Sequence, residues 1–231
     1  MNKALVIVIA LLLAITLLPA CGGGEGGGGG GNETGGGGGG GGGVPSGYTG
    51  FMAATAGQWV DYVMAAAGEE SHQIWENIGE DTVDGVSCVG FEMTMAMPGE
   101  ESIMQIWTDV ATQQLVKYVV KAGGVVMCMD VSQFQYEPPE TETPSEYAPD
   151  TPDISYGTYT VPGNGQTVNV AIFKVEPGIE TWVSSEVPFG IVKVIAPEMT
   201  MSLNNFGLSG AVRDISKAEM EDCPQFQIPG Y

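Results

Sequence analysis

The sequence predicts an all-β fold, mainly antiparallel: a curved sheet or incomplete half-barrel with one short C-terminal helix, preceded by a disordered Gly-rich linker. Three observations support this prediction. From Gly57 onward, apolar residues recur at every second position, which is the period of a β-strand. Short polar or glycine-containing stretches separate the alternating runs, as in an antiparallel meander. Only one run, near the C-terminus, has a helical pattern.

Eleven alternating runs follow one another along the chain. We expect each of them to form a strand: residues 58–64, 71–79, 86–97, 102–109, 114–123, 125–131, 154–161, 166–175, 180–187, 189–196 and 198–203. Asp84-Gly85, between the second and third runs, predicts a hairpin turn. Residues 137–153 hold five prolines and six acids, so we expect an extended acidic loop there. Residues 213–223 predict the helix, with Asp214 as its N-cap.

The first twenty residues have the composition of an export signal. One cation, Lys3, precedes an apolar run over residues 4–18, which indicates a signal peptide over residues 1–20. That run is short for a membrane-spanning helix, which needs about 20 residues, so a retained anchor is the weaker interpretation. Residues 18–21, Leu-Pro-Ala-Cys, resemble the lipobox of bacterial and archaeal lipoproteins, in which the cysteine becomes the lipidated N-terminus. The resemblance implies lipidation of Cys21; the alternative is an ordinary cleavage site followed by a free thiol.

A glycine-rich segment separates Cys21 from the predicted domain. Residues 22–43 contain eighteen glycines, so we expect a disordered tether over residues 21–43 with a root-mean-square reach of roughly 25 Å. Asn32 begins an Asn-Glu-Thr glycosylation sequon within it, which makes Asn32 a candidate N-glycosylation site. Residues 44–231 are then long enough for a single β half-barrel domain.

The charge balance disfavours nucleic acid and anionic lipid surfaces as partners. The chain has 28 acidic and 7 basic residues, a formal net charge of −21. Nucleic-acid binding is disfavoured, because phosphate contacts need clustered Lys and Arg. An anionic lipid surface would also repel the domain, which favours a tethered protein over a surface-adsorbed one. The acidity is also typical of a protein that must stay soluble outside the cell.

Three cysteines remain in the predicted domain. Cys88, Cys128 and Cys223 permit one disulfide in an oxidising compartment, with the pairing left open and one thiol over. The strand period puts Cys88 and Cys128 on the same face, and Cys223 is an equally good partner for either. Because no pair has C-x-x-C spacing, we expect no zinc or redox site, and no cofactor. His72 is the sole histidine and no nucleophile motif is present, so we do not expect an enzyme.

Methionines gather on one face of the predicted sheet, and the face that carries Cys88 is expected to be more polar. We predict a concave cavity for a lipid or other hydrophobic ligand, lined by Phe91, Met93, Met95, Met97, Met104, Met127 and Met129. One alternative is that these residues form an ordinary packed core. A weaker one is a Cu(I) site, because thioether sulfur binds that ion, but the sole imidazole lies in another strand.

Residues 78–93, 106–118 and 170–194 resemble successive hairpins of the lipoprotein-carrier superfamily, which includes the LolA/LolB-type carriers. The matching positions are Trp107, Asp109, Lys117, Trp182, Ser184, Val187, Pro188 and Lys193. The resemblance implies a half-open β-barrel whose concave side takes acyl chains. The sequence departs from that family because it lacks the long amphipathic helices that close the cavity.

Together these observations predict an exported lipoprotein of the cell envelope, anchored by lipid to the outer face of the cell membrane. Its expected activity is non-catalytic binding of a hydrophobic molecule. A structural or interaction module of the envelope, with a fully packed core and no ligand, is the alternative function.

Overall fold

A computed structural model describes residues 54–97, 99–129, 131, 153–176 and 178–226. All of these residues belong to one compact unit. Three of the sequence predictions concern residues outside this part of the chain: the signal peptide, the tether with Cys21 and Asn32, and nearly all of the acidic loop 137–153.

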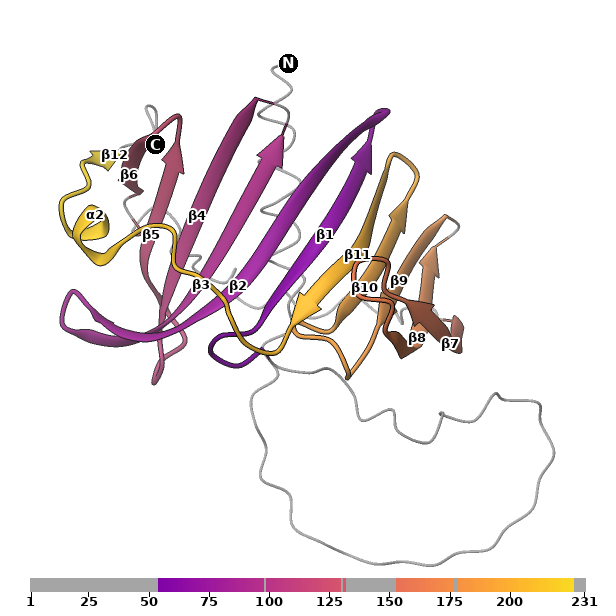
Figure 1. Cartoon of the computed structure of the whole chain (residues 1–231). Coiled ribbons are helices and arrows are strands. Elements are labelled where there is room, and N and C mark those ends of the chain that lie inside the picture. The colour runs from indigo at the N-terminus through magenta and orange to yellow at the C-terminus, as the bar shows by residue number, and fades with distance from the viewer. Residues whose placement is uncertain (1–53, 98, 130, 132–152, 177, 227–231) are drawn as a thin grey trace, which may run out of the picture. The chain divides into compact units, whose positions relative to one another are not determined.

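The described residues form one twelve-stranded sheet with a single short helix (Figure 1). The strands are β1 (Trp59–Ala66), β2 (Glu69–Val83), β3 (Val86–Met97), β4 (Glu100–Asp109), β5 (Leu115–Ala122), β6 (Val125–Met129), β7 (Asp153–Thr160), β8 (Thr167–Glu176), β9 (Ile179–Val183), β10 (Ile191–Ala196), β11 (Met199–Gly207) and β12 (Gln225–Phe226). This confirms the all-β fold class, and each of the eleven predicted strands is present. β12 was not predicted, because a two-residue strand carries no alternation.

Two meanders build the sheet. The strands β1 to β6 pair in chain order, β7 to β11 do the same, and β1 joins β11 to unite the two halves. Every pairing is antiparallel except that of β12 with β6. The sheet is open, with β12 at one edge and β7 at the other.

The turn between β2 and β3 has the predicted conformation. Asp84 and Gly85 connect the two strands and both have positive φ, 49° and 84°. Two such residues define the type I′ turn, whose twist matches that of antiparallel strands.

The helix is shorter than predicted and begins at a different cap. It is α2 (Lys217–Glu221), and its N-cap is Ser216, so the prediction that Asp214 caps it is wrong. Ser216 and Glu219 form a capping box, in which each side chain accepts a hydrogen bond from the other residue's backbone N–H. The backbone of Asp214 is instead bound to the sheet. No helix within the described residues is both long and apolar enough to span a bilayer.

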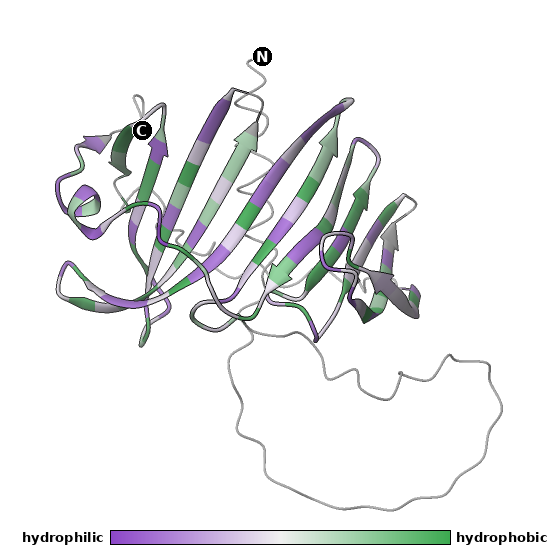
Figure 2. Cartoon of the chain, in the orientation of Figure 1, coloured by the Kyte–Doolittle hydropathy of each residue, from purple (hydrophilic) through white to green (hydrophobic). Residues whose placement is uncertain are grey.

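Hydrophobic and hydrophilic residues alternate along many of the strands (Figure 2). Because successive side chains of a strand point to opposite faces of its sheet, this alternation sorts them between the two faces. One face, here called the methionine face, carries Phe91, Met93, Met95, Met104, Met127 and Met129. The opposite face is crossed by residues 208–223, here called the C-terminal strap, which run from β11 to β6 (Figure 1). We call this second face the strap face.

The strap face is not the more polar face that the sequence predicts. Cys88, Trp107 and Val119 are buried on it and pack with Ile215 and Met220 from the strap. The other apolar cluster belongs to the methionine face, where Val60, Tyr62 and Leu203 lie buried on the same side of the sheet as Trp75 and Met93. The prediction failed because the strap supplies the apolar cover, and strand periodicity carries no information about a distant segment.

Candidate functional site

Strand pairing aligns the predicted ligand-binding residues into rows across the methionine face. Directly paired residues project on the same side of a sheet. One apolar row crosses seven neighbouring strands and consists of Phe206, Val60, Trp75, Met93, Met104, Val120 and Met127. The adjacent row consists of Phe91, Ile106, Tyr118 and Met129. The structure therefore brings together residues that lie up to 146 positions apart in the chain (from 60 to 206).

The predicted residues differ in burial. Met93 and Met104 are buried, with 3% and 7% of their surface exposed, and the hydroxyl of Tyr118 lies 2.6 Å from the sulfur of Met104. Phe91, Met95, Met127 and Met129 are each partly buried. Met97 is the last residue of β3, and its side chain lies outside the described part of the structure.

An aromatic cluster lies beside the methionines. The ring of Trp75 makes edge-to-face contacts with Tyr62, Phe91 and Phe189, at centroid distances of 5.0, 6.1 and 6.0 Å. The rings of Phe91 and Phe189 also contact each other at 5.6 Å. Such contacts fix ring orientation, so Trp75 forms a rigid boundary to the more flexible methionines.

The strap face carries a second straight row, which sequence reasoning missed. Trp59, Glu76, Glu92, Gln105, Val119 and Cys128 are successive cross-strand partners on β1 to β6. The C-terminal strap follows this row and is bonded to five of these six residues. The exception is the row's β5 member, Val119, which packs with strap residues in the strap-face core.

The strap binds first to β1 and β2. The indole N–H of Trp59 donates to the carbonyl of Ser209 at 3.1 Å. The backbone N–H of Val212 then donates to Oε1 of Glu76 at 2.8 Å. These bonds satisfy polar groups that the strap would otherwise leave unpaired against the sheet.

Over β3 and β4 both the N–H groups and a carbonyl group of the strap backbone are hydrogen-bonded to side chains of the sheet. The N–H groups of Asp214 and Ile215 donate to Glu92, at 2.9 and 3.4 Å. The amide nitrogen of Gln105 donates both to Glu92 and to the carbonyl of Ile215, the latter at 2.8 Å. Gln105 in turn accepts a hydrogen bond from the indole of Trp107 at 3.2 Å. Glu92 and Gln105 are completely buried, so this network fixes the strap within the protein interior.

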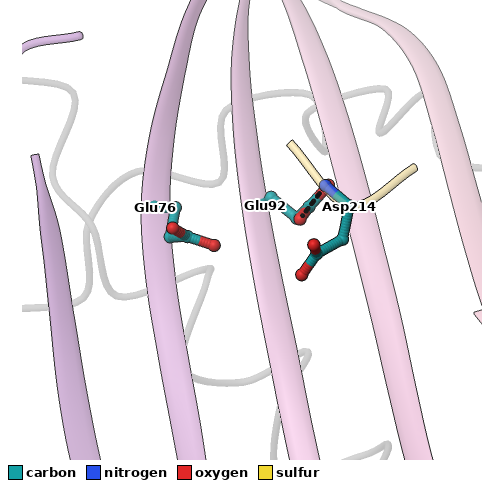
Figure 3. A group of neighbouring side chains, drawn as sticks. All are labelled: Glu76, Glu92 and Asp214. Atoms are coloured by element: carbon teal, nitrogen blue, oxygen red, sulfur yellow. Dashed lines mark hydrogen bonds between the residues drawn. The ribbon is translucent and has the colours of Figure 1, made fainter. Parts of the chain in front are cut away.

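Three carboxylates meet where the strap crosses β2 and β3. Oxygen atoms of Glu76, Glu92 and Asp214 lie within 4.8 Å of one another (Figure 3). Burial raises the pKa of Glu92, and hydrogen bonds from Gln105, Asp214 and Ile215 oppose that rise. Burial also raises the pKa of Glu76, and the negative charges of Glu92 and Asp214 raise it further.

Within the described residues, these three carboxylates form a candidate site for a cation, because carboxylate oxygens are hard ligands. Both glutamates, however, already accept backbone N–H groups from the strap. Their observed role is therefore to hold the strap to the sheet.

Two cationic side chains of the strap, those of Arg213 and Lys217, also bind to the sheet. The guanidinium of Arg213 stacks over the ring of Trp107 at 4.8 Å and donates to Asp81 at 3.0 Å. Lys217 donates to the other oxygen of Asp81 at 2.8 Å. Hydrogen bonds from Lys217 and then Arg213 lower the pKa of Asp81 to about 2. Asp81 therefore stays ionised, and keeps both ion pairs, at any ordinary pH.

The structure selects one of the disulfide pairings that the sequence left open. Cys128 on β6 is bonded to Cys223 at the end of the strap. Cys88 is a buried free thiol on the same face as Cys128. Burial raises the pKa of Cys88, which keeps it protonated and poorly reactive at neutral pH.

His72 has a local partner on the neighbouring strand. Its Nδ1 lies 3.1 Å from a carboxylate oxygen of Asp61, and the other oxygen of Asp61 accepts from Asn204 at 2.7 Å. The residues that hydrogen-bond in this group include no hydroxyl or thiol that could serve as a nucleophile. The expectation that the chain is not an enzyme stays a prediction.

Comparison with protein-family models and with curated proteins finds no match for this chain. The resemblance to the lipoprotein-carrier superfamily therefore stays a prediction. Two of its motif positions serve packing and turn formation here. Trp107 is buried, and Asp109 accepts hydrogen bonds from the backbone of Ala111 and the hydroxyl of Thr112 at the β4–β5 turn.

Proposed function

We propose that this protein is an exported lipoprotein that binds a lipid or another hydrophobic molecule on the methionine face without catalysing a reaction. The observation that carries the proposal is the apolar row that crosses seven strands from Phe206 to Met127. Long flexible thioethers line its β3–β6 half, and rigid aromatic rings border it. Methionine suits a surface that adapts to varied apolar ligands.

Over β3–β6 the two faces of the sheet differ in a way that supports this assignment. The strap face is covered by the chain's own C-terminal strap, which packs Ile215 and Met220 against it. On the methionine face Phe91, Met95, Met127 and Met129 each keep part of their surface exposed. An acyl chain laid along this face would remove that apolar surface from water, at about 25 cal/mol per Å².

The anchor is the second part of the proposal. Lipid on Cys21 and a glycine tether would hold the acidic domain near a membrane whose anionic surface repels it. We expect the wild-type chain to enter the detergent phase on phase separation, and the Cys21→Ser variant to enter the aqueous phase. A Cys21→Ser variant that still enters the detergent phase would show that another segment anchors the chain.

Trp75 provides a direct test of ligand binding, because it lies on the methionine face whereas Trp59 lies on the strap face. Fatty acid brominated on its acyl chain quenches a tryptophan that it contacts. We expect saturable quenching in the wild-type chain and in Trp59→Phe, and its loss in Trp75→Phe. Phenylalanine keeps an aromatic ring at position 75, so the cluster with Tyr62, Phe91 and Phe189 should persist.

The opposite result has a clear meaning. If folded wild-type protein shows no quenching of Trp75, or the same quenching in Trp75→Phe as in Trp59→Phe, the methionine face takes no acyl chain. The burial of Met93 and Met104 would then favour the alternative, a structural or interaction module of the cell envelope with a packed face.

A further inference from the structure

Phe189 holds a backbone conformation that phenylalanine rarely adopts. It lies in the loop between β9 and β10, residues 184–190, where the N–H of Gly190 donates to the carbonyl of Val187 at 3.0 Å and closes a tight turn. Pro188 and Phe189 are the second and third residues of this turn, and Phe189 has a φ of 61°. A proline followed by a residue of positive φ is typical of a type II turn, whose third position favours glycine or asparagine. A bulky side chain at positive φ is strained, and such strain persists only where other contacts hold it.

The contacts that hold Phe189 in place lie on the methionine face. Its ring meets Trp75 on β2 and Phe91 on β3 edge to face, at centroid distances of 6.0 and 5.6 Å. The same loop contributes Val187, which is completely buried, to the apolar cluster that contains Val60. At Trp75 the apolar row is therefore covered by the chain's own loop, whereas the partly exposed methionines lie on β3–β6.

We propose that Phe189 is a specificity-determining residue, which ends the ligand site at Trp75 and so limits the length of the apolar chain that the methionine face can hold. This role rests on the function proposed above, the binding of an apolar chain along that face. A chain laid over the methionines of β3–β6 meets the ring of Phe189 before it reaches Val60. Methylenes beyond that point stay in water and add nothing to the affinity.

The turn itself does not require a phenylalanine. Glycine at position 189 would adopt the same φ without strain, as Gly190 does at a φ of 73°. The ring is explained instead by its place against Trp75 and Phe91, where it packs and also excludes other groups. A residue that only packs there should affect stability alone, whereas a residue that ends the site should also set how affinity depends on chain length.

Competition between fatty acids of different length tests the proposal. All proteins carry Cys21→Ser, so that no lipid on the chain itself competes. Saturated acids from decanoic to stearic displace a brominated fatty acid, whose binding is measured by quenching of Trp75. Without further substitution, the affinity should stop rising once the acyl chain reaches Phe189. In Phe189→Ala and in Phe189→Gly it should continue to rise, by up to about fourfold for each further buried methylene.

The two variants at position 189 also control for folding. Both remove the ring, but only glycine relieves the strained φ, so Phe189→Gly should have a higher Tm than Phe189→Ala. At an ordinary position the order is the reverse, because alanine restricts the unfolded chain more than glycine does. Phe173→Ala removes a partly buried ring from β8 and should keep the chain-length dependence of Phe189-containing protein.

The outcomes separate this role from the function on which it rests. If the brominated acid quenches Trp75 but both variants at position 189 show the same chain-length dependence as the protein with Phe189, the proposal is overturned and the ligand site stands. If the brominated acid quenches Trp75 in none of these proteins, the methionine face takes no acyl chain, and both proposals fall.

Discussion

Glu76 and Glu92 are ionisable groups in an interior made mostly of apolar side chains. Their exposed fractions are 7% and 0%. A buried carboxylate is costly unless hydrogen bonds compensate it, and here the N–H groups of Val212, Asp214 and Ile215 do so. The hydrogen bonds to the strap therefore offset the desolvation of the two glutamates, and they fix the path of the strap.

The pKa shifts of these glutamates set the direction of the pH dependence. A carboxyl whose pKa is raised by folding stabilises the protein below its unfolded pKa, and this contribution is lost as pH rises through the folded pKa. Folding lowers the pKa values of Asp81 and Glu219 to about 2. These two groups therefore stabilise the fold above their unfolded pKa values, and this contribution is lost only as pH falls below about 4. The contribution of Glu76 and Glu92 to the free energy of unfolding should therefore decline as pH rises above about 4.5, the usual pKa of a glutamate.

Glu76→Gln isolates this effect. Glutamine can still accept from Val212 through its oxygen, and its amide can donate toward Glu92 and Asp214. We expect the variant to raise the free energy of unfolding and the Tm at pH 7.5, with the difference vanishing near pH 4, where the carboxyl is protonated in both states. Thermal denaturation across this pH range provides the measurement.

The matched control for that experiment is Glu80→Gln, an exposed glutamate on the same strand. It should change Tm by less than about 1 °C at every pH. A Glu76→Gln variant that is less stable than the wild type at pH 7.5, or whose effect is the same at pH 4 and 7.5, would contradict the assignment of a raised pKa to Glu76.

At the scale of elements, the strands and the sorting of their side chains could be predicted from the sequence. Strand periodicity is local, so the alternation of residues within β3 and within β6 is enough to place Met93 and Met127 on the apolar side of each strand, and the pairing confirms that they share one face. The Asp84-Gly85 turn was predictable for the same reason, because its backbone conformation depends on two adjacent residues.

The strap could not be predicted from local pattern. Its contacts join residues such as Glu92 and Ile215, which are 123 positions apart. Register decides that Glu76, Glu92 and Gln105 form one row, and periodicity does not fix register. One signal was available in the sequence of β3. Glu92 alternates with the apolar residues Phe91 and Met93, which point to the opposite face of the sheet. A glutamate there can be either solvent-exposed or bound to a covering segment.

At the scale of the whole molecule, the described cations are all engaged locally. Five form ion pairs and one stacks on an aromatic ring: Lys117 with Asp84, Lys121 with Glu219, Lys174 with Glu180, Arg213 and Lys217 with Asp81, and Lys193 over Trp182. Since the chain carries a net charge of −21, a large acidic excess is left uncompensated. This excess disfavours adsorption to anionic membranes and agrees with the proposed tether.

The central claim is that the methionine face holds a hydrophobic molecule, and native mass spectrometry tests it most directly. The Cys21→Ser chain, purified from its own host without detergent, should show a mass excess that disappears on denaturation, with lipid recovered in the extract. Met127→Glu, on the methionine face, should reduce the excess, whereas Val212→Glu, exposed on the strap, should retain it. A chain of bare mass, still bare after incubation with host lipids, would contradict the claim.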